Sequence, residues 1–425
     1  MKPRFYICIP ALFLAFLSAD CQKISKADKV TLANLQAHVH ALDADTAGGR
    51  RMGMEGEKKT GDYIISALSQ AGVRPKGDDN GWLQVFSVDD GRQIGADASF
   101  TVDGQPLALH TDWFPLSLCP AGQVSGSPAI ALQESGVPWF VDLKDLLEAD
   151  GGAQANIADA IRAKATSCAK KGATALIVYN SSARHADKLR FDPKDRPQPA
   201  PIPVVYLTHE AKKKYFPDES ASSDLRIRIS YAEKSRTGHN VVGFLDNSAA
   251  TTAIITTRYA NISGLAGMIE LARLLVASKF RANNYLFLIC SGSDAGGAGA
   301  DYYAGHPATD LKKVNYVLEL GHLGELDGHA LFVGGYHSSP SWPQITGAIR
   351  DKKAITPQAD SSADGAGDHS IFLQQQIPVL VLSTAPGFGD EPAGTVNYTG
   401  ELQVVKYIYS LIGAANPRGK LSFTP

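Results

Sequence analysis

Charged and polar side chains follow the ends of several apolar segments in the C-terminal half of the chain. Arg258 follows the β-branched run TTAIITT, Ser293 and Asp294 follow NYLFLIC, and His322 follows VNYVLELG. Strands of a mainly parallel sheet end at one edge, and open α/β sheets bind their ligands there. We therefore expect these side chains, together with Asp368, to gather in one cleft.

Two kinds of chemistry are compatible with these residue types. Asp294, His322 and Asp390 are of the types that hold a single metal ion. A nucleophilic triad around Ser293 is less favoured, because no Gly-x-Ser-x-Gly turn surrounds that serine. The metal site is therefore the enzymatic alternative that the sequence leaves open.

Two local features have structural explanations. The sequence GDHS predicts that Asp368 and His369 begin a helix, where Asp368 would cap free backbone N–H groups. Arg258 is expected to pair with Asp294 as an internal strut, and a bidentate contact with a carboxylate ligand is the alternative.

Five apolar segments are predicted strands because each is rich in β-branched or aromatic residues. They are NVVGFL, TTAIITT, NYLFLIC, VNYVLEL and IPVLVLS. Helices are expected after Asn261, near Asp294, after Trp342, near His369 and after Thr399. This alternation indicates an α/β fold whose mixed, mainly parallel sheet is flanked by helices.

The chain is expected to have four parts. Residues 1–21 form a signal peptide, and 22–92 form the N-terminal part of the main domain, with helices over VTLANLQAHVHAL and EGEKKTGDYIISALSQAG. Residues 93–236 form a β-rich insertion, in which short alternating strands and Pro-rich loops enclose one helix, NIADAIRAKATSCAKK. Residues 237–425 form the α/β domain.

Composition and the N-terminal residues limit the function classes. The chain has 44% hydrophobic residues, 20% charged residues and a formal net charge of −2, so a nucleic-acid binder is not expected. The start, MKPRFYICIPALFLAFLSADC, has the basic, apolar and small-residue regions of a secretory signal. Because LSADC resembles a bacterial lipobox, simple cleavage and a lipid anchor at Cys21 both stay open. We expect an exported protein that is periplasmic, anchored to the cell envelope or secreted, and that is not integral to the membrane.

The cysteines indicate no thiolate metal site, because no C-x-x-C pair occurs. Cys119 and Cys168 could pair in an oxidising compartment, which their spacing does not decide. Cys290 ends an apolar strand and is expected to belong to the core.

A series of motifs along the chain resembles that of a known family. HNVVGFLDN, SGLAGMIELARLL, NYLFLICSGSDAGGAGADYYAGHP, LKKVNYVLELGHLGEL, GDHSIFL, IPVLVL and VNYTGELQVVKYIY occur in this order. The order resembles that of the M28 family of zinc aminopeptidases, and the front segment, HVHALDADTAGGRRMGMEGEKKTGDYI, is similar to the N-terminal region of that family. The β-rich segment resembles the protease-associated insertion of many members. The resemblance covers almost all of the mature chain and implies a zinc-aminopeptidase-like fold.

The resemblance also implies a centre with two zinc ions, bridged by an aspartate and a water, and a glutamate general base. Compared position by position, this chain departs from that pattern. Its first strand ends without the metal-binding His-x-Asp, the loop with the bridging aspartate is missing, and the expected Ser-Gly-Glu-Glu reads Ser-Gly-Ser-Asp. The substituted positions are Arg258, Ala260, Ser293, Asp294, Gly321 and Asp390.

These substitutions predict the loss of the zinc site and of the base, and hence a chain without a cofactor. The leading hypothesis is a catalytically inactive pseudopeptidase that binds a peptide, a ligand or a partner protein. The alternative is an active metallo-aminopeptidase, or another hydrolase, with a rebuilt zinc site. A structural role as the inactive partner of an active paralogue is a third hypothesis. The ligand-binding candidates are Arg258, Asp294, His322, Asp368 and His369.

Overall fold

The computed structural model of the chain describes residues 25–43, 49–149, 157–181, 189–326, 330–349, 355–361, 367–386 and 396–425. The predicted signal peptide, with Cys21, and the predicted site residue Asp390 lie outside these ranges. Within them, no helix combines the length and the apolar character that crossing a membrane would require. The chain forms two compact units, one from the segments up to Phe86 and from Gly238 onward, the other from Ser87–Thr237.

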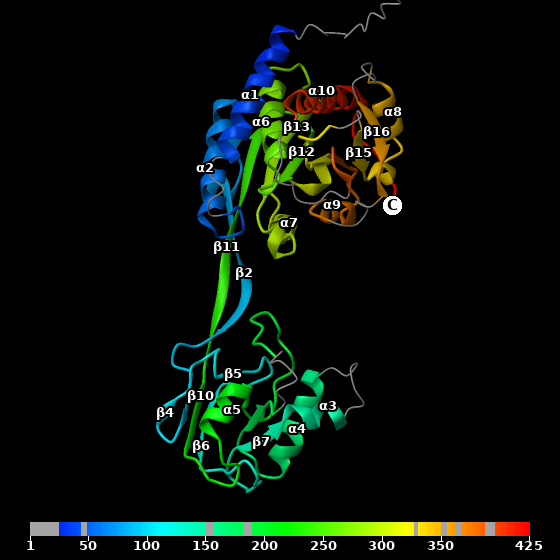
Figure 1. Cartoon of the computed structure of the whole chain (residues 1–425). Helices are drawn as coiled ribbons and strands as arrows, with labels where there is room; N and C mark the ends of the chain where they lie inside the picture. Colours follow the sequence, from blue (N-terminus) through cyan, green and yellow to red (C-terminus); the bar gives the residue numbers. More distant parts are fainter. Residues whose placement is uncertain are drawn as a thin grey trace, which may run out of the picture. The chain divides into compact units, whose positions relative to one another are not determined.

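The first unit alternates strands and helices (Figure 1). Its helices are α1 (Lys26–Asp43), α2 (Glu55–Gln70), α6 (Ile262–Val276), α7 (Ala298–Gly305), α8 (Trp342–Gly347), α9 (Ser370–Gln374) and α10 (Tyr398–Ala415). Its strands are β1 (Arg74–Pro75), β12 (Thr251–Arg258), β13 (Asn283–Cys290), β14 (Val314–Leu320), β15 (Ala330–Gly334), β16 (Thr356–Ala359) and β17 (Val379–Ser383). The strands β2 (Leu83–Ile94) and β11 (Tyr231–Leu245) pair with each other, and along them the chain passes between the units.

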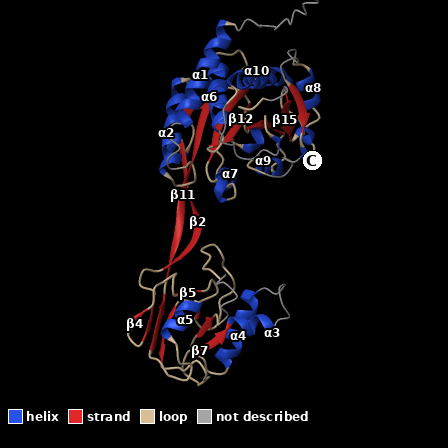
Figure 2. Ribbon diagram, in the orientation of Figure 1, coloured by secondary structure: helices blue, strands red, loops and turns tan. Residues whose placement is uncertain are grey.

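The strands join in a nine-stranded sheet with the order β1-β11-β13-β12-β14-β17-β15-β16, in which β2 also pairs with β11. The central strands β13, β12, β14 and β17 run parallel, and so do β15 and β16. Antiparallel pairs flank them, β11 against β13 and β15 against β17. The prediction of a mixed, mainly parallel sheet flanked by helices is therefore confirmed (Figure 2).

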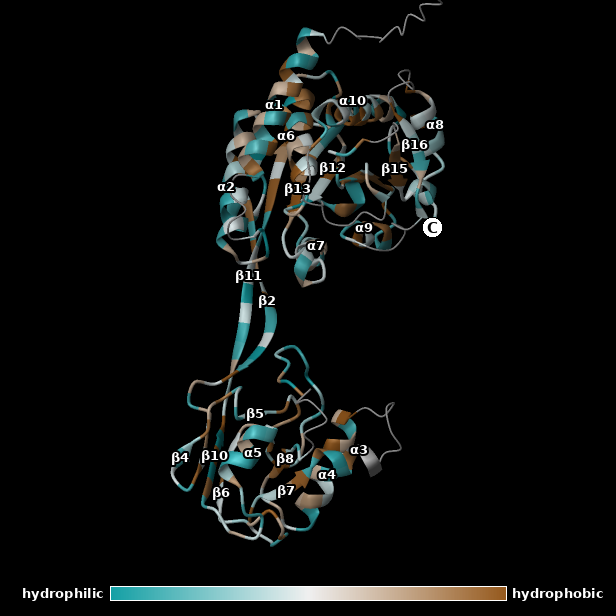
Figure 3. Ribbon diagram, viewed as in Figure 1, coloured by the Kyte–Doolittle hydropathy of each residue, from teal (hydrophilic) through white to brown (hydrophobic). Residues whose placement is uncertain are grey.

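The central strands are apolar on both faces because helices cover both sides (Figure 3). Ile255, Phe287 and Leu318 belong to one core cluster with buried residues of α1, α6 and α10. The neighbours Ile254 and Leu288 point to the opposite face, where they pack with buried residues of α7 and α9. Burying one such side chain stabilises the fold by roughly 1.5–3 kcal/mol. The two clusters hold the strand ends at fixed positions.

The second unit has two four-stranded sheets, one with the order β4-β3-β10-β6 and one with the order β5-β9-β8-β7. Its strands are β3 (Ser99–Val102), β4 (Gln105–Pro106), β5 (Trp113–Pro115), β6 (Gly122–Gly126), β7 (Trp139–Asp142), β8 (Leu176–Tyr179), β9 (Val204–Leu207) and β10 (Leu225–Ile229). Its helices are α3 (Leu143–Ala149), α4 (Ile157–Lys170) and α5 (His209–Tyr215). It has apolar clusters of its own. Its relation to a protease-associated insertion, and the bounds 93–236, stay predictions.

Two details of the element prediction need correction. The predicted strand NVVGFL is only the last part of a longer strand, because β11 already begins at Tyr231, directly after the break at Ser230 that ends β10. The strands β15 and β16 were not predicted. They are short, and β16 is exposed throughout and contains a proline, so the apolar pattern of a strand is missing there.

Candidate functional site

The candidate site lies where the three central strands end. Arg258 is the last residue of β12, and its register partner in β13 is Cys290. On the other side of β12, Glu319 of β14 pairs with Thr256. The helix α6 packs closely on the end of β14, since a Cβ on Gly264 would lie 2.6 Å from the carbonyl oxygen of Gly321. The strand ends therefore bring groups from distant parts of the sequence together.

Arg258 forms ion pairs with two carboxylates. Its Nη2 lies 3.5 Å from Oε1 of Glu319, and its Nε lies 3.3 Å from Oδ2 of Asp368. All three side chains are largely buried, with 16% of the arginine side chain exposed. The predicted strut exists, but the predicted partner was wrong. Asp294 instead accepts a hydrogen bond from the backbone N–H of Met52, at 3.2 Å.

His369 extends this network, because its Nδ1 lies 2.8 Å from Oε2 of Glu319. The predicted helix does start here, as α9, but the capping prediction for Asp368 was wrong. His369 is the N-cap residue, and no side-chain hydrogen bond caps the helix. The carboxylate of Asp368 faces Arg258, because a buried acid is stabilised more by a cation than by backbone N–H groups alone.

The two acids differ in their proton affinity. Burial raises the pKa of Asp368 to about 6, although the positive charge of Arg258 acts in the opposite direction. Burial also tends to raise the pKa of Glu319, but the hydrogen bond to His369 and the charges of His369 and Arg258 outweigh it and hold that pKa below the ordinary 4.5. Glu319 is therefore the ionised partner of Arg258 and the hydrogen-bond partner of His369, and Asp368 is the acid that takes up a proton first.

Cys290 lies beside this network and is a buried core residue, as predicted. Burial, and then the carboxylates of Asp368 and Glu319, raise the pKa of its thiol well above the ordinary value. A thiol in this state is a poor nucleophile.

A second group of polar contacts fixes the loop before α2 against the end of β13. The hydroxyl of Ser291 donates a hydrogen bond to the buried carboxylate of Glu57, which also accepts the backbone N–H of Gly53 at 2.6 Å. The contact between Asp294 and Met52 lies next to it. These contacts hold Met52 and Gly53, in the loop just before α2, near the site.

His322 is buried, and its contacts lie between α6 and the end of β14. Its Nδ1 lies 3.5 Å from the hydroxyl of Ser263, and its Nε2 lies 3.5 Å from Oε2 of Glu325. The hydroxyl of Ser263 also accepts the backbone N–H of Leu323. These contacts tie the start of α6 to the loop after β14.

A small pocket opens beside Arg258 and has a volume of about 270 Å³. Ser293, Ser370, Asp301 and Asp368 line it together with Arg258. The remaining lining residues are Gly296, Gly297, Ala300, Gly367 and Ile371. Of the predicted candidates, Arg258, Ser293 and Asp368 therefore share one pocket.

The other two substituted positions carry no reactive group. Ala260 lies in the turn between β12 and α6. Gly321 is buried directly after β14, and a Cβ there would lie 3.1 Å from the Cβ of Ser383. A larger side chain at position 321 would therefore require Ser383 to move.

The residues described around this pocket do not fit a zinc centre. Across the described part of the chain, no three His, Cys, Asp or Glu side chains are placed to hold a metal ion. The acids Glu319 and Asp368 face a guanidinium instead. For the alternative site, Asp294 and His322 have the contacts given above, and Asp390 lies outside the described residues.

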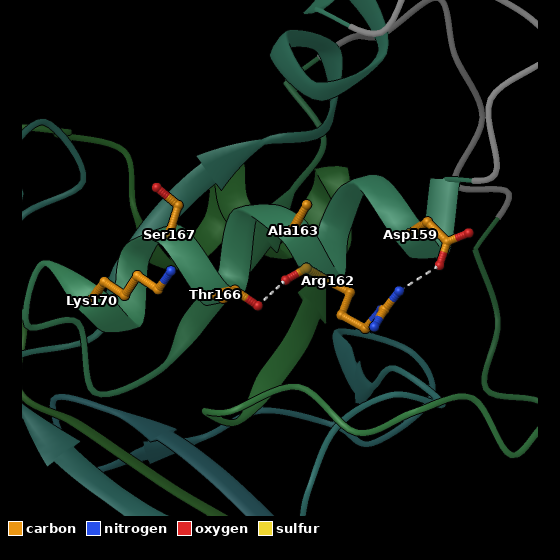
Figure 4. Close-up of a pocket in the computed structure, with 6 residues that line it drawn as sticks. All are labelled: Asp159, Arg162, Ala163, Thr166, Ser167 and Lys170. Atoms are coloured by element: carbon orange, nitrogen blue, oxygen red, sulfur yellow. Dashed lines mark hydrogen bonds and ion pairs between the residues drawn. The ribbon is translucent and has the colours of Figure 1, made fainter.

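Another depression lies along one face of α4 in the second unit (Figure 4). Its six lining residues all come from this helix, and two of them, Arg162 and Asp159, form an exposed ion pair at 3.2 Å. Polar groups do not converge on it from different elements. It is therefore a helix surface and not a built site.

Two residues of the site were missed by sequence reasoning, Glu319 and Glu57. Glu319 lies in the largely apolar segment VNYVLEL, and Glu57 lies on the face of α2 that also buries Ile64 and Leu68. A carboxylate at a position that the apolar pattern predicts to be buried normally has a partner. That signal was available, although it does not identify the partner.

Comparisons with known proteins agree with this architecture. Residues 261–399 match the profile of Peptidase family M28. This part of the chain is therefore similar to the peptidase M28 domain. No curated protein sequence matches the chain.

The chain is also similar to solved structures of aminopeptidases. The aminopeptidase from Aneurinibacillus sp. strain AM-1 has 17% identity and a TM-score of 0.50, over 94% of this chain and 98% of that one. At this identity the likeness shows the fold alone. BSAP, a zinc aminopeptidase from Bacillus subtilis, has 15% identity and a TM-score of 0.47, over 93% and 96%. The peptidase M28 precursor from Shewanella amazonensis SB2B has 16% identity and a TM-score of 0.47, over 94% and 98%.

Proposed function

We propose that this protein is an exported, M28 peptidase-like protein that does not hydrolyse peptides, and that its cleft binds a peptide, a small ligand or a partner protein. The observation that carries this proposal is the side-chain content of the cleft. At the strand ends, Arg258 forms ion pairs with Glu319 and Asp368, and His369 contacts Glu319. A metallohydrolase would need metal ligands in this place.

The missing base supports the same conclusion. Ser293 stands where the resemblance places the glutamate base. A serine hydroxyl does not accept a proton near neutral pH, whereas a carboxylate does. Export is supported by the sequence of residues 1–21, with Cys21 as the residue that a lipid anchor would modify.

The pocket supports a binding role. Its volume of about 270 Å³ suits one side chain or a small polar molecule rather than a large cofactor. Ser293, Ser370 and Asp301 come from different segments and converge on it, so that they can orient a ligand through hydrogen bonds. A longer peptide or a partner protein would insert one residue there.

The test combines a hydrolysis assay with a binding assay on the mature protein. The proposal expects no hydrolysis of aminoacyl p-nitroanilides above the blank, with zinc, manganese or cobalt added in turn. It also expects one or more members of a panel of dipeptides and amino-acid amides to raise the melting temperature, because a ligand of the native state stabilises it by mass action.

A matched pair of variants assigns that shift to the pocket. Ser293→Leu should remove the shift, and Ser69→Leu, at an exposed position of α2, should retain it. Hydrolysis that is lost in Asp294→Ala or His322→Ala would instead establish the alternative, an active enzyme with a rebuilt site. If neither assay responds and a second protein co-purifies, the structural-partner hypothesis would replace ligand binding.

A further inference from the structure

One guanidinium group joins three separate segments of the site. Arg258 ends β12, Glu319 lies in the neighbouring strand β14, and Asp368 lies at the start of α9. We propose that Arg258 is the structural cation of the cleft, so that the fold of the cleft depends on this side chain and not on a bound metal ion. The inference concerns stability and does not rest on the proposed ligand binding.

The charges of this part of the cleft require a cation. Glu319 and Asp368 are 5% and 6% exposed, so water screens their charges only weakly. Two buried carboxylates at one site repel each other and require a cation or a proton. Arg258 lies within ion-pair distance of both, at 3.5 and 3.3 Å, and therefore supplies that cation.

The shape of the guanidinium suits the positions of the two acids. Its Nε faces Asp368 while its Nη2 faces Glu319, so that one planar group contacts acids on two different elements. A lysine ammonium in the same place would be a single point of charge and could not offer this fork of donors.

The backbone approaches this group closely. A Cβ on Gly367 would lie 2.6 Å from Nη2 of Arg258, and Gly367 has a φ of +110° that favours glycine. On the α7 side, a Cβ on Gly297 would lie 3.2 Å from Oδ1 of Asp368. The backbone thus packs directly against the ion pair. A metal ion with its own ligands would need the space that the guanidinium and this backbone fill.

Thermal unfolding of the full mature chain tests the inference. We expect the melting temperature of the wild type to change by less than about 1 °C in excess EDTA or in added zinc. Arg258→Met should lower it by roughly 5 °C or more, because the variant leaves Asp368 without its cation and Glu319 with His369 alone. Arg258→Lys should give an intermediate loss, and Arg74→Met, at an exposed position of β1, is the matched control.

Two results would overturn the inference. One is a wild type that EDTA destabilises and zinc restores, and the other is an Arg258→Met protein as stable as the Arg74→Met control. If Arg258→Met does not fold, the EDTA comparison on the wild type and the Arg258→Lys variant decide the question. An active peptidase whose melting temperature does not respond to EDTA would contradict the proposed function and leave this inference standing.

Discussion

Asp368 is a buried acid whose ionised form is destabilised by burial and only partly stabilised by Arg258. Its carboxylate faces Arg258, yet burial is the larger effect and raises its pKa to about 6. The ordinary value is 3.8, so the folded protein binds a proton at a higher pH than the unfolded chain does. The contribution of Asp368 to stability therefore grows as the pH falls from about 7 towards 4.

This sign leads to a prediction for Asp368→Asn, which removes the titrating group. The free energy of unfolding of the variant minus that of the wild type should be larger at pH 7 than at pH 5, because only the wild type becomes more stable as Asp368 takes up its proton. We expect the change between the two pH values to be on the order of 1–2 kcal/mol. Urea unfolding at both pH values measures it, with Asp301→Asn as the control for an acid of the same pocket. A difference that does not vary with pH would contradict the prediction.

At the same scale, the sequence identified the residues of the site better than their partners. The positions of Arg258 and Asp294 directly after apolar segments placed them at one sheet edge, where Asp368 was expected as well. It could not show that Glu319 points toward Arg258, because the direction of a side chain depends on the register between β12 and β14. The competition between helix capping and ion pairing at Asp368 likewise depends on the distance to Arg258, which tertiary packing sets.

At the scale of elements, α7 is positioned by one close approach of the backbone. A Cβ on Gly299 would lie 2.3 Å from the backbone oxygen of Ser291 and 2.3 Å from Oδ1 of Asn240. Asn240 also donates to the carbonyl of Gly299 and accepts the N–H of Ser291. Gly305, at the other end of the same helix, has no heavy atom within 4 Å of such a Cβ.

Alanine substitution of these two glycines should therefore have opposite effects. Gly299→Ala should lower the free energy of unfolding by about 1–3 kcal/mol, because a backbone oxygen cannot move away cheaply. Gly305→Ala should be neutral or stabilising by up to about 1 kcal/mol, since alanine restricts the unfolded chain. Denaturant unfolding of both variants measures the pair. Equal losses in the two would show that the close approach does not control α7.

The central strands and helices were predictable because the apolar pattern of each lies within its own short stretch of sequence. β12, β13 and β14 have near-continuous apolar sequences, and α6 follows with a long apolar face. β15 is apolar but only five residues long, and β16 is exposed and contains a proline. They are recognised as strands through their pairing, β15 with β17 and β16 with β15. The break between β10 and β11 at Ser230 arises because the two strands pair in different sheets, which the sequence alone does not encode.

At the scale of the whole molecule, each of the two compact units has its own apolar core. Leu288 is fully buried in the first, and Leu176 is fully buried in the second. Calorimetry of the full chain should therefore show two transitions. Leu176→Ala should lower one of them and Leu288→Ala the other, each by roughly 2–5 kcal/mol of unfolding free energy. One shared transition that both variants lower equally would show that the units unfold together.

The cysteines are distributed over the same two units. Cys119 and Cys168, whose pairing the sequence left open, are free and buried in the second unit, and Cys290 is free and buried in the first. A buried thiol reacts with a labelling reagent only after its surroundings open. In the mature chain, which would lack Cys8, and with Cys21 replaced by serine, the three buried thiols would therefore report on the local unfolding of their surroundings. The labelling rate of Cys290 would measure how often the core of the first unit opens. The labelling rates of Cys119 and Cys168 would measure the same for the second unit.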